Sequence, residues 1–157
     1  MNTRRRRPPV RRWVVIKTYR ALSTAPVERI WWKLANLGDL SWHPLMARAD
    51  VPWGLLAKPG ILFEAVSRLS PLRMRLFVER VDQGEFLSFR VFALPGIEEQ
   101  VSYQVHSTVL GTQITYSVTL RGWLAPLVWS LIRPHAERVA QRLAQAAEQE
   151  AQRIQPI

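Results

Sequence analysis

A chain of 157 residues with 48% apolar side chains is long enough to form one domain with a sizeable core, and it contains no cysteine. The absence of cysteine excludes disulfide bonds, thiolate metal ligands and a cysteine nucleophile, and it favours a reducing compartment, so we expect a cytoplasmic protein. The longest strongly apolar stretch, residues 122–132, contains Pro126 and is too short for a transmembrane helix.

The formal net charge of +10 is concentrated at the start of the chain. Six arginines lie among residues 1–12, and the first acidic residue is Glu28. We therefore expect residues 1–12 to form a disordered basic arm, followed by a single ligand-binding domain over residues 13–155. The arm is either a solubilising tail or a peripheral contact with the phosphates of an anionic membrane or of nucleic acid.

The first elements are a strand and a short helix. Residues 13–20 are rich in Trp, Val, Ile and Tyr, which predicts a strand. Residues 23–26 predict a helix start with proline in the first turn. Apolar residues then recur at spacings of three and four, which predicts one buried face on a helix that ends near residues 36–38. These residues are Val27, Ile30, Trp31 and Leu34. A Trp-His-Pro loop follows at residues 42–44.

From residue 46 onward the apolar period changes to two, as in half-buried strands. Strands are expected over residues 46–51, 61–69, 72–81, 86–93, 98–109 and 113–122. The segments between them contain Gly or Pro, which predicts hairpins and hence an antiparallel meander. In the last two strands the apolar set predicted to face the core includes Tyr103 and Tyr116.

Residues 123–153 predict one long helix with an apolar stripe. Pro134 removes a backbone donor, so we expect the helix to bend near residues 130–133. One helix cannot fill a strongly curved sheet of six or seven strands. Either an apolar cavity of roughly 300–1,000 Å³ remains between them, or the sheet flattens over a fully packed core.

Three segments and the final helix suggest a known fold. The segments are residues 25–36 (Ala-Pro-Val-Glu-Arg-Ile-Trp-Trp-Lys-Leu-Ala-Asn), residues 40–44 (Leu-Ser-Trp-His-Pro) and Pro59-Gly60. Together with the order of elements they resemble the helix-grip fold of the START-like (SRPBCC) superfamily, which includes birch-pollen-allergen-like and polyketide cyclase/dehydrase-like proteins. The resemblance covers about residues 13–153 and implies an α+β fold with a cavity for lipids, sterols, quinones, polyketides or hormones. It implies no catalytic residue.

Polar side chains on the predicted inner surface are candidate ligand-binding residues. Tyr103 and Tyr116 each bring a hydroxyl that could orient the polar end of an apolar ligand. His135 is predicted on the helix face towards the cavity, with Val128 and Leu131 beside it, where it could donate to a ligand carbonyl or act as a general base. The alternatives are tyrosine hydroxyls bonded to backbone or water, and a histidine hydrogen bonded within the core.

Trp42 and His43 are predicted at the mouth of the cavity, although Trp42 could instead fill the core. His106 is expected to face solvent, and the three histidines lack metal-ligand spacing, so neither a metal nor a cofactor is expected.

The leading functional hypothesis is a non-enzymatic protein that binds or carries a hydrophobic molecule such as a lipid, a quinone or a polyketide-like compound. One alternative is a cyclase or dehydratase in which His135 moves a proton. The other is an interaction protein whose arm docks on an anionic membrane or on RNA.

Overall fold

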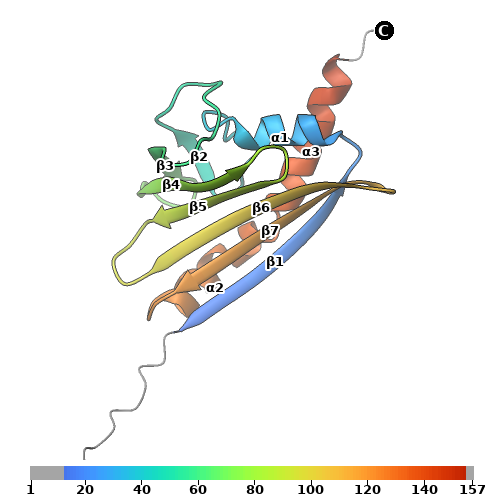
Figure 1. Cartoon of the computed structure of the whole chain (residues 1–157). Coiled ribbons are helices and arrows are strands. Elements are labelled where there is room, and N and C mark those ends of the chain that lie inside the picture. Colours follow the sequence, from blue (N-terminus) through green and yellow to red (C-terminus); the bar gives the residue numbers. More distant parts are fainter. Residues whose placement is uncertain (1–12, 155–157) are drawn as a thin grey trace, which may run out of the picture.

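A seven-stranded antiparallel sheet curls around the C-terminal helices in the computed structural model, which describes residues 13–154 (Figure 1). The strands lie in the order β1-β7-β6-β5-β4-β3-β2. Their bounds are β1 Val14–Ser23, β2 Met46–Ala49, β3 Leu62–Ser67, β4 Arg73–Asp82, β5 Phe86–Phe92, β6 Glu98–Thr108 and β7 Gly111–Arg121. The expected α+β helix-grip architecture and the antiparallel meander are therefore confirmed. The arm predicted over residues 1–12 lies outside the described residues.

Strand β1 is longer than its sequence suggested. The local composition predicted an end at Arg20, but the strand continues to Ser23 because it stays paired with β7 along its whole length. The register joins Val14 to Arg121 at one end and Ser23 to Thr112 at the other. Tertiary pairing has overridden the weak local preference of residues 21–23 for strand.

The predicted strand faces are confirmed. On β6 and β7 alternate side chains are buried, including Val101, Tyr103, Ile114 and Tyr116, while the residues between them are more exposed. His106 faces solvent, as its position in this alternation predicted. One face of the sheet is therefore apolar and lies against the helices.

The short helix α1 (Val27–Ala35) buries the predicted apolar face. Ile30, Trp31 and Leu34 are almost fully inaccessible, and α1 packs against the last helix of the chain. Pro26 precedes the helix in an extended conformation, and Glu28 in the first turn suits the positive end of the helix dipole.

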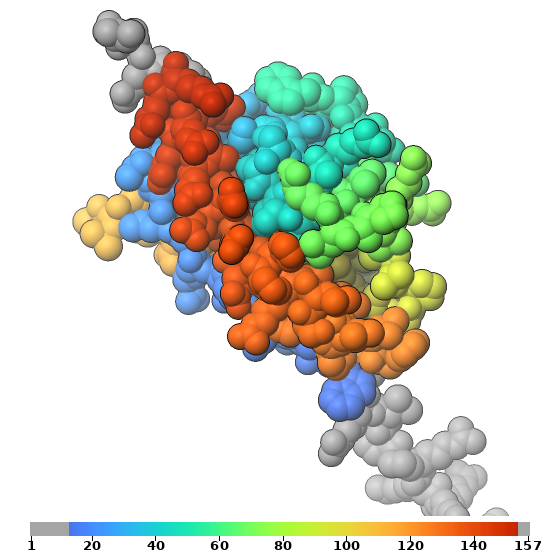
Figure 2. All heavy atoms as spheres, turned by 180° about the vertical axis from the view of Figure 1, so that it is seen from behind, coloured from blue at the N-terminus to red at the C-terminus, as the bar shows by residue number. Residues whose placement is uncertain are grey.

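The single C-terminal helix expected from the sequence is two helices, α2 (Ala125–Ala136) and α3 (Val139–Ile154). The expected bend is present but lies after Pro134 and not at residues 130–133, because α2 continues past the proline and ends two residues after it, at Ala136. Helical hydrogen bonding continues from the Glu137 amide to the Arg133 carbonyl, and the Arg138 amide then donates to His135 in a tighter turn. Figure 2 shows α2 and α3 running across one side of the molecule, with β3 and β4 beside α2.

No helix among residues 13–154 combines the length and the apolar character needed to cross a membrane.

Candidate ligand-binding cavity

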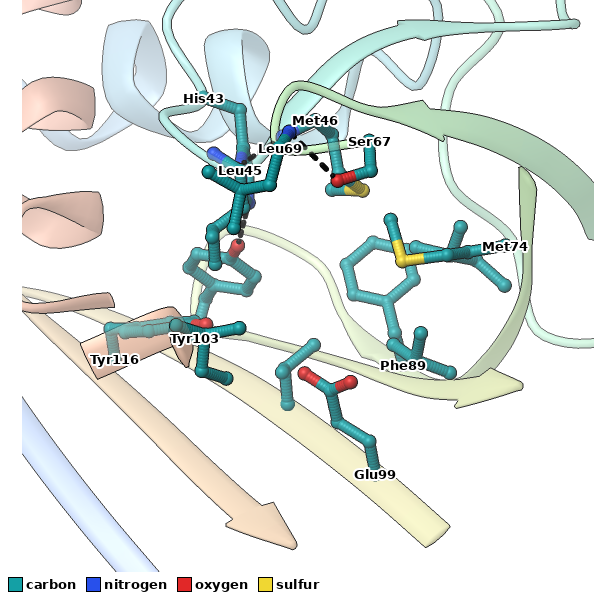
Figure 3. Close-up of a pocket in the computed structure, with 14 residues that line it drawn as sticks. His43, Leu45, Met46, Ser67, Leu69, Met74, Phe89, Glu99, Tyr103 and Tyr116 are labelled. Atoms are coloured by element: carbon teal, nitrogen blue, oxygen red, sulfur yellow. Dashed lines mark hydrogen bonds between the residues drawn. The ribbon is translucent and has the colours of Figure 1, made fainter. Parts of the chain in front are cut away.

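A mainly apolar cavity lies between the middle of the sheet, the loop before β2 and helix α2 (Figure 3). Its volume is about 90 Å³. The lining residues come from the loop and β2 (His43, Leu45, Met46), from β3 and the following turn (Ser67, Leu69), from β4 and β5 (Met74, Leu76, Phe89, Val91), from β6 and β7 (Glu99, Val101, Tyr103, Tyr116) and from α2 (Ile132).

The cavity is smaller than the volume expected from the sequence, because aromatic side chains fill much of the concave face of the sheet. Phe89 meets both Phe63 and Tyr103 edge to face, and the rings of Tyr103 and Tyr116 lie 5.1 Å apart. An engineered cavity of roughly 150 Å³ is known to take up benzene. A one-ring ligand would thus require only a modest shift of the lining.

Two methionines give the lining the freedom to make that shift. Met46 and Met74 both face the cavity, and the unbranched methionine side chain adapts readily to irregular spaces. Leu69 also lines the cavity while 46% of its surface is exposed, so the cavity approaches solvent at the turn between β3 and β4.

His43 is held as a neutral ring with a defined tautomer. Its Nδ1 atom accepts hydrogen bonds from the amides of Leu45 and Met46, at 3.0 and 3.2 Å. Because a neutral imidazole has one acceptor and one donor nitrogen, the proton lies on Nε2. Burial, helped by the nearby charge of Arg68, lowers the pKa of His43 to about 3. Arg68 also anchors the loop, since its Nε donates to the His43 carbonyl at 2.7 Å.

The Tyr103 hydroxyl is left with its own proton free to donate. His43 Nε2 lies 3.4 Å from this hydroxyl, and the tautomer of His43 makes the imidazole the donor and Tyr103 the acceptor. The ring is 2% exposed, and burial, followed by the charge of Glu99, raises the pKa of Tyr103 far above its usual value. The O–H group therefore stays protonated and can donate to a ligand.

Glu99 is a cavity residue that the sequence analysis missed. Its carboxylate points into the space near Tyr103 and Phe89 (Figure 3), and no described residue forms a hydrogen bond or ion pair with it. Burial raises the pKa of Glu99 to about 7. The signal was available, because Glu99 has the same strand parity as Val101 and Tyr103.

A pH-dependent stability follows from the raised pKa of Glu99. In the unfolded chain this carboxyl titrates near 4.5, so between pH 4.5 and 7 the folded protein holds a proton that the unfolded chain has released. Stability contributed by this group is therefore lost as pH rises through that window. We expect Glu99→Gln to gain stability relative to wild type from pH 4.5 to 7, by at most about 1.4 kcal/mol per pH unit, and no further above pH 7.

Urea unfolding of both proteins across this pH range measures the difference. His43 titrates in the opposite sense but is present in both proteins, so its contribution cancels. A difference that does not vary with pH would contradict the burial of the Glu99 carboxyl.

The other predicted site residues lie outside the cavity lining. Trp42 is buried behind His43, with 5.0 Å between their rings, and meets Tyr103 edge to face, while its Nε1 has no hydrogen-bond partner among the described residues. His135 and Val128 are partly buried, and Leu131 is 63% exposed. Val128 packs against the core together with Ala125, Ile132 and Ala136, so Leu131 points outward from the predicted helix face. The ligand contacts predicted for these residues remain predictions.

Comparison with known proteins gives a fold but no family. Neither a protein-family model nor a curated protein matches the sequence. Among solved structures, norcoclaurine synthase from Thalictrum flavum, in complex with dopamine and hydroxybenzaldehyde, is 12% identical, with a TM-score of 0.65 over 94% of this chain and 92% of its own. Ara h 8.0201 is also 12% identical, with a TM-score of 0.67 over 86% of this chain and 98% of its own.

DynU16, a protein of the dynemicin biosynthetic locus, is 19% identical with a TM-score of 0.65; the match covers 87% of this chain but 48% of DynU16. At these identities the comparisons show that the chain shares the fold of these proteins, which is the helix-grip fold.

Proposed function

We propose that this protein binds a small hydrophobic molecule whose polar end faces Tyr103. The proposal depends on one observation above all, an apolar cavity lined by the buried Tyr103 hydroxyl, which accepts from His43 and keeps its own proton free to donate. A buried donor without a partner is costly, so a ligand acceptor at this point would be favoured over a purely apolar molecule.

The size of the cavity favours a compact ligand. A volume of about 90 Å³, with two methionines in the lining, suits one aromatic ring or a short branched chain better than a sterol. The norcoclaurine synthase structure contains two one-ring molecules, dopamine and hydroxybenzaldehyde, which is consistent with such ligands in this fold.

Removing the Tyr103 hydroxyl tests the proposal. We expect Tyr103→Phe to weaken binding of acetophenone, which has a carbonyl acceptor, by about tenfold, as the loss of one hydrogen bond predicts. Binding of propylbenzene, which has no acceptor, should change little. Calorimetric titration of both ligands measures the effect, with Tyr19→Phe as the control, since Tyr19 stacks on Trp129 away from the cavity lining. Equal losses for both ligands would contradict the role of the hydroxyl.

A second candidate function is favoured by an exposed apolar stripe on and just before α2. Trp123, Leu127 and Leu131 are spaced four residues apart and are 72%, 59% and 63% exposed. Trp13 is 54% exposed and lies next to the start of the stripe, since its carbonyl accepts a hydrogen bond from the Gly122 amide. Contiguous large apolar side chains on a surface mark a contact site.

We propose that this stripe docks on an anionic lipid bilayer. Six arginines precede Trp13 in the sequence, and each basic residue near an anionic bilayer contributes about 1 kcal/mol to binding. Tryptophan and leucine can insert at the boundary between headgroups and acyl chains, which favours a membrane over RNA.

Vesicle sedimentation tests this second function. Wild type should bind vesicles that contain phosphatidylserine far better than vesicles of phosphatidylcholine alone. Both deletion of residues 1–12 and the double change Leu127→Glu with Leu131→Glu should weaken that binding at least tenfold. The control is Val109→Glu with Leu110→Glu, which changes an exposed apolar pair on the β6–β7 hairpin. Binding to RNA that survives the glutamate changes on α2, with no binding to vesicles, would contradict membrane docking.

A further inference from the structure

Glu99 is the only acidic residue that lines the cavity, and its carboxylate has no partner among the described residues. Its neighbours across the strands are Val91 and Leu120, both apolar. Glu99 is partly exposed, but its side chain also lines the cavity among apolar groups, where a carboxylate is less well solvated than in water and has no compensating partner. Such a residue is far more informative than another buried leucine.

Among the described residues no cation forms an ion pair with this carboxylate, although Arg90 and Arg121 border a polar surface hollow that Glu99 also lines. The ionisable groups that share the cavity are His43, which stays neutral, and the tyrosines Tyr103 and Tyr116, which stay protonated. The arginines nearest in sequence on the adjoining strands, Arg90 and Arg121, are exposed and pair in register with Gln100 and Glu98, whose side chains alternate with that of Glu99. Arg90 is already bonded to Glu79 at 2.8 Å.

We propose that, in addition to the acceptor that faces Tyr103, the ligand carries a protonated amine on its one-ring apolar body, and that this ammonium group pairs with Glu99. This inference depends on the proposed function, because it assigns the ligand class of the same cavity. The apolar body would lie against Val101, Met74 and Leu76, and the aromatic rings of Phe89 and Tyr103, which line the same cavity, could add cation–π attraction.

The chemistry separates an amine from the other polar groups a ligand could offer. A ligand carboxylate would be repelled by Glu99. An alcohol would donate one hydrogen bond but leave the negative charge uncompensated. An ammonium group both donates hydrogen bonds and neutralises the charge, and charge-assisted hydrogen bonds are the strongest available here.

Binding of an amine should depend on pH in a defined direction. The ammonium group pairs with the ionised form of Glu99, and burial raises the pKa of that carboxyl to about 7 in the free protein. Below pH 7 only a minority of the protein has Glu99 ionised and able to pair with the amine. The apparent affinity for the amine therefore falls about tenfold for each pH unit below 7. Above pH 7 it levels off until the amine itself loses its proton, near pH 10.

Two ligands of almost equal shape provide the test. 2-Phenylethylamine and propylbenzene differ by an ammonium group in place of a methyl group, and calorimetric titration compares them at pH 8 and pH 5. We expect the amine to bind wild type at least tenfold more tightly than propylbenzene at pH 8, and to lose about a hundredfold in affinity at pH 5. Propylbenzene should bind equally at both pH values.

Glu99→Gln removes the charge while keeping the size of the side chain, so it should abolish both the preference for the amine and the pH dependence. Glu98→Gln is the matched control, because the neighbouring Glu98 is exposed and lies outside the cavity lining. Wild type that binds propylbenzene but shows no preference for the amine would overturn the inference and leave the proposed function intact. A preference for 2-phenylethanol over the amine would also overturn it. Failure of both propylbenzene and acetophenone to bind would overturn the proposed function itself.

Discussion

Replacing Val101 with phenylalanine is expected to abolish binding of propylbenzene, with at least a hundredfold loss of affinity. Val101 lies on β6 between Glu99 and Tyr103, is 7% exposed and lines the cavity. The added ring would occupy most of a space of about 90 Å³ and exclude the ligand. Because the ring enters existing space, the cost of overpacking should stay at or below about 1–3 kcal/mol. Calorimetric titration measures the affinity, and a thermal melt verifies folding.

Gln104→Phe is the control for this experiment. It adds the same ring on the same strand, but Gln104 is exposed on the opposite face of the sheet. Its affinity for propylbenzene should match that of wild type. If the folded Val101→Phe protein bound propylbenzene as well as wild type did, the ligand would occupy another site.

Replacing Leu143 with alanine should lower the free energy of unfolding by about 2–5 kcal/mol, as for other buried leucines. Leu143 lies on α3, is fully buried and belongs to the core formed by α3 with the sheet and α1. The change removes apolar contacts and leaves a void that the packed sheet cannot close. Urea unfolding followed by circular dichroism measures the difference.

Leu127→Ala on α2 is the matched control, since this leucine is 59% exposed. Its effect should stay within about 0.5 kcal/mol. Comparable losses in the two variants would mean that α3 does not provide the core contacts described for it.

Much of the fold was predictable because strand alternation and helical spacing are local signals. The inward faces of β6 and β7 follow directly from the alternation of apolar and polar residues, and so does the buried face of α1. The same alternation places Glu99 on the inner face of β6. One glutamate at the start of an otherwise apolar set does not show, however, whether its side chain enters the core or lies at an exposed strand end.

The arrangement of the site depends on contacts between distant parts of the chain, which no local pattern contains. His43 and Tyr103 are 60 residues apart, and the tautomer that orients the hydroxyl depends on two backbone amides of the loop. The position of the helix bend was misjudged for a similar reason. Pro134 alone predicted a bend at residues 130–133, whereas helical hydrogen bonding continues to Glu137 and the chain turns between α2 and α3.

Methyl NMR of the three methionines tests most directly whether the cavity is a ligand site. Met46 and Met74 line the cavity, while Met1 lies at the start of the chain and serves as an internal control. With ¹³C-methyl methionine, titration with propylbenzene should shift the Met46 and Met74 signals together and saturably, leave Met1 unchanged, and have no effect in Val101→Phe. Binding that leaves Met46 and Met74 unshifted, or equal shifts in Val101→Phe, would contradict a ligand site in this cavity.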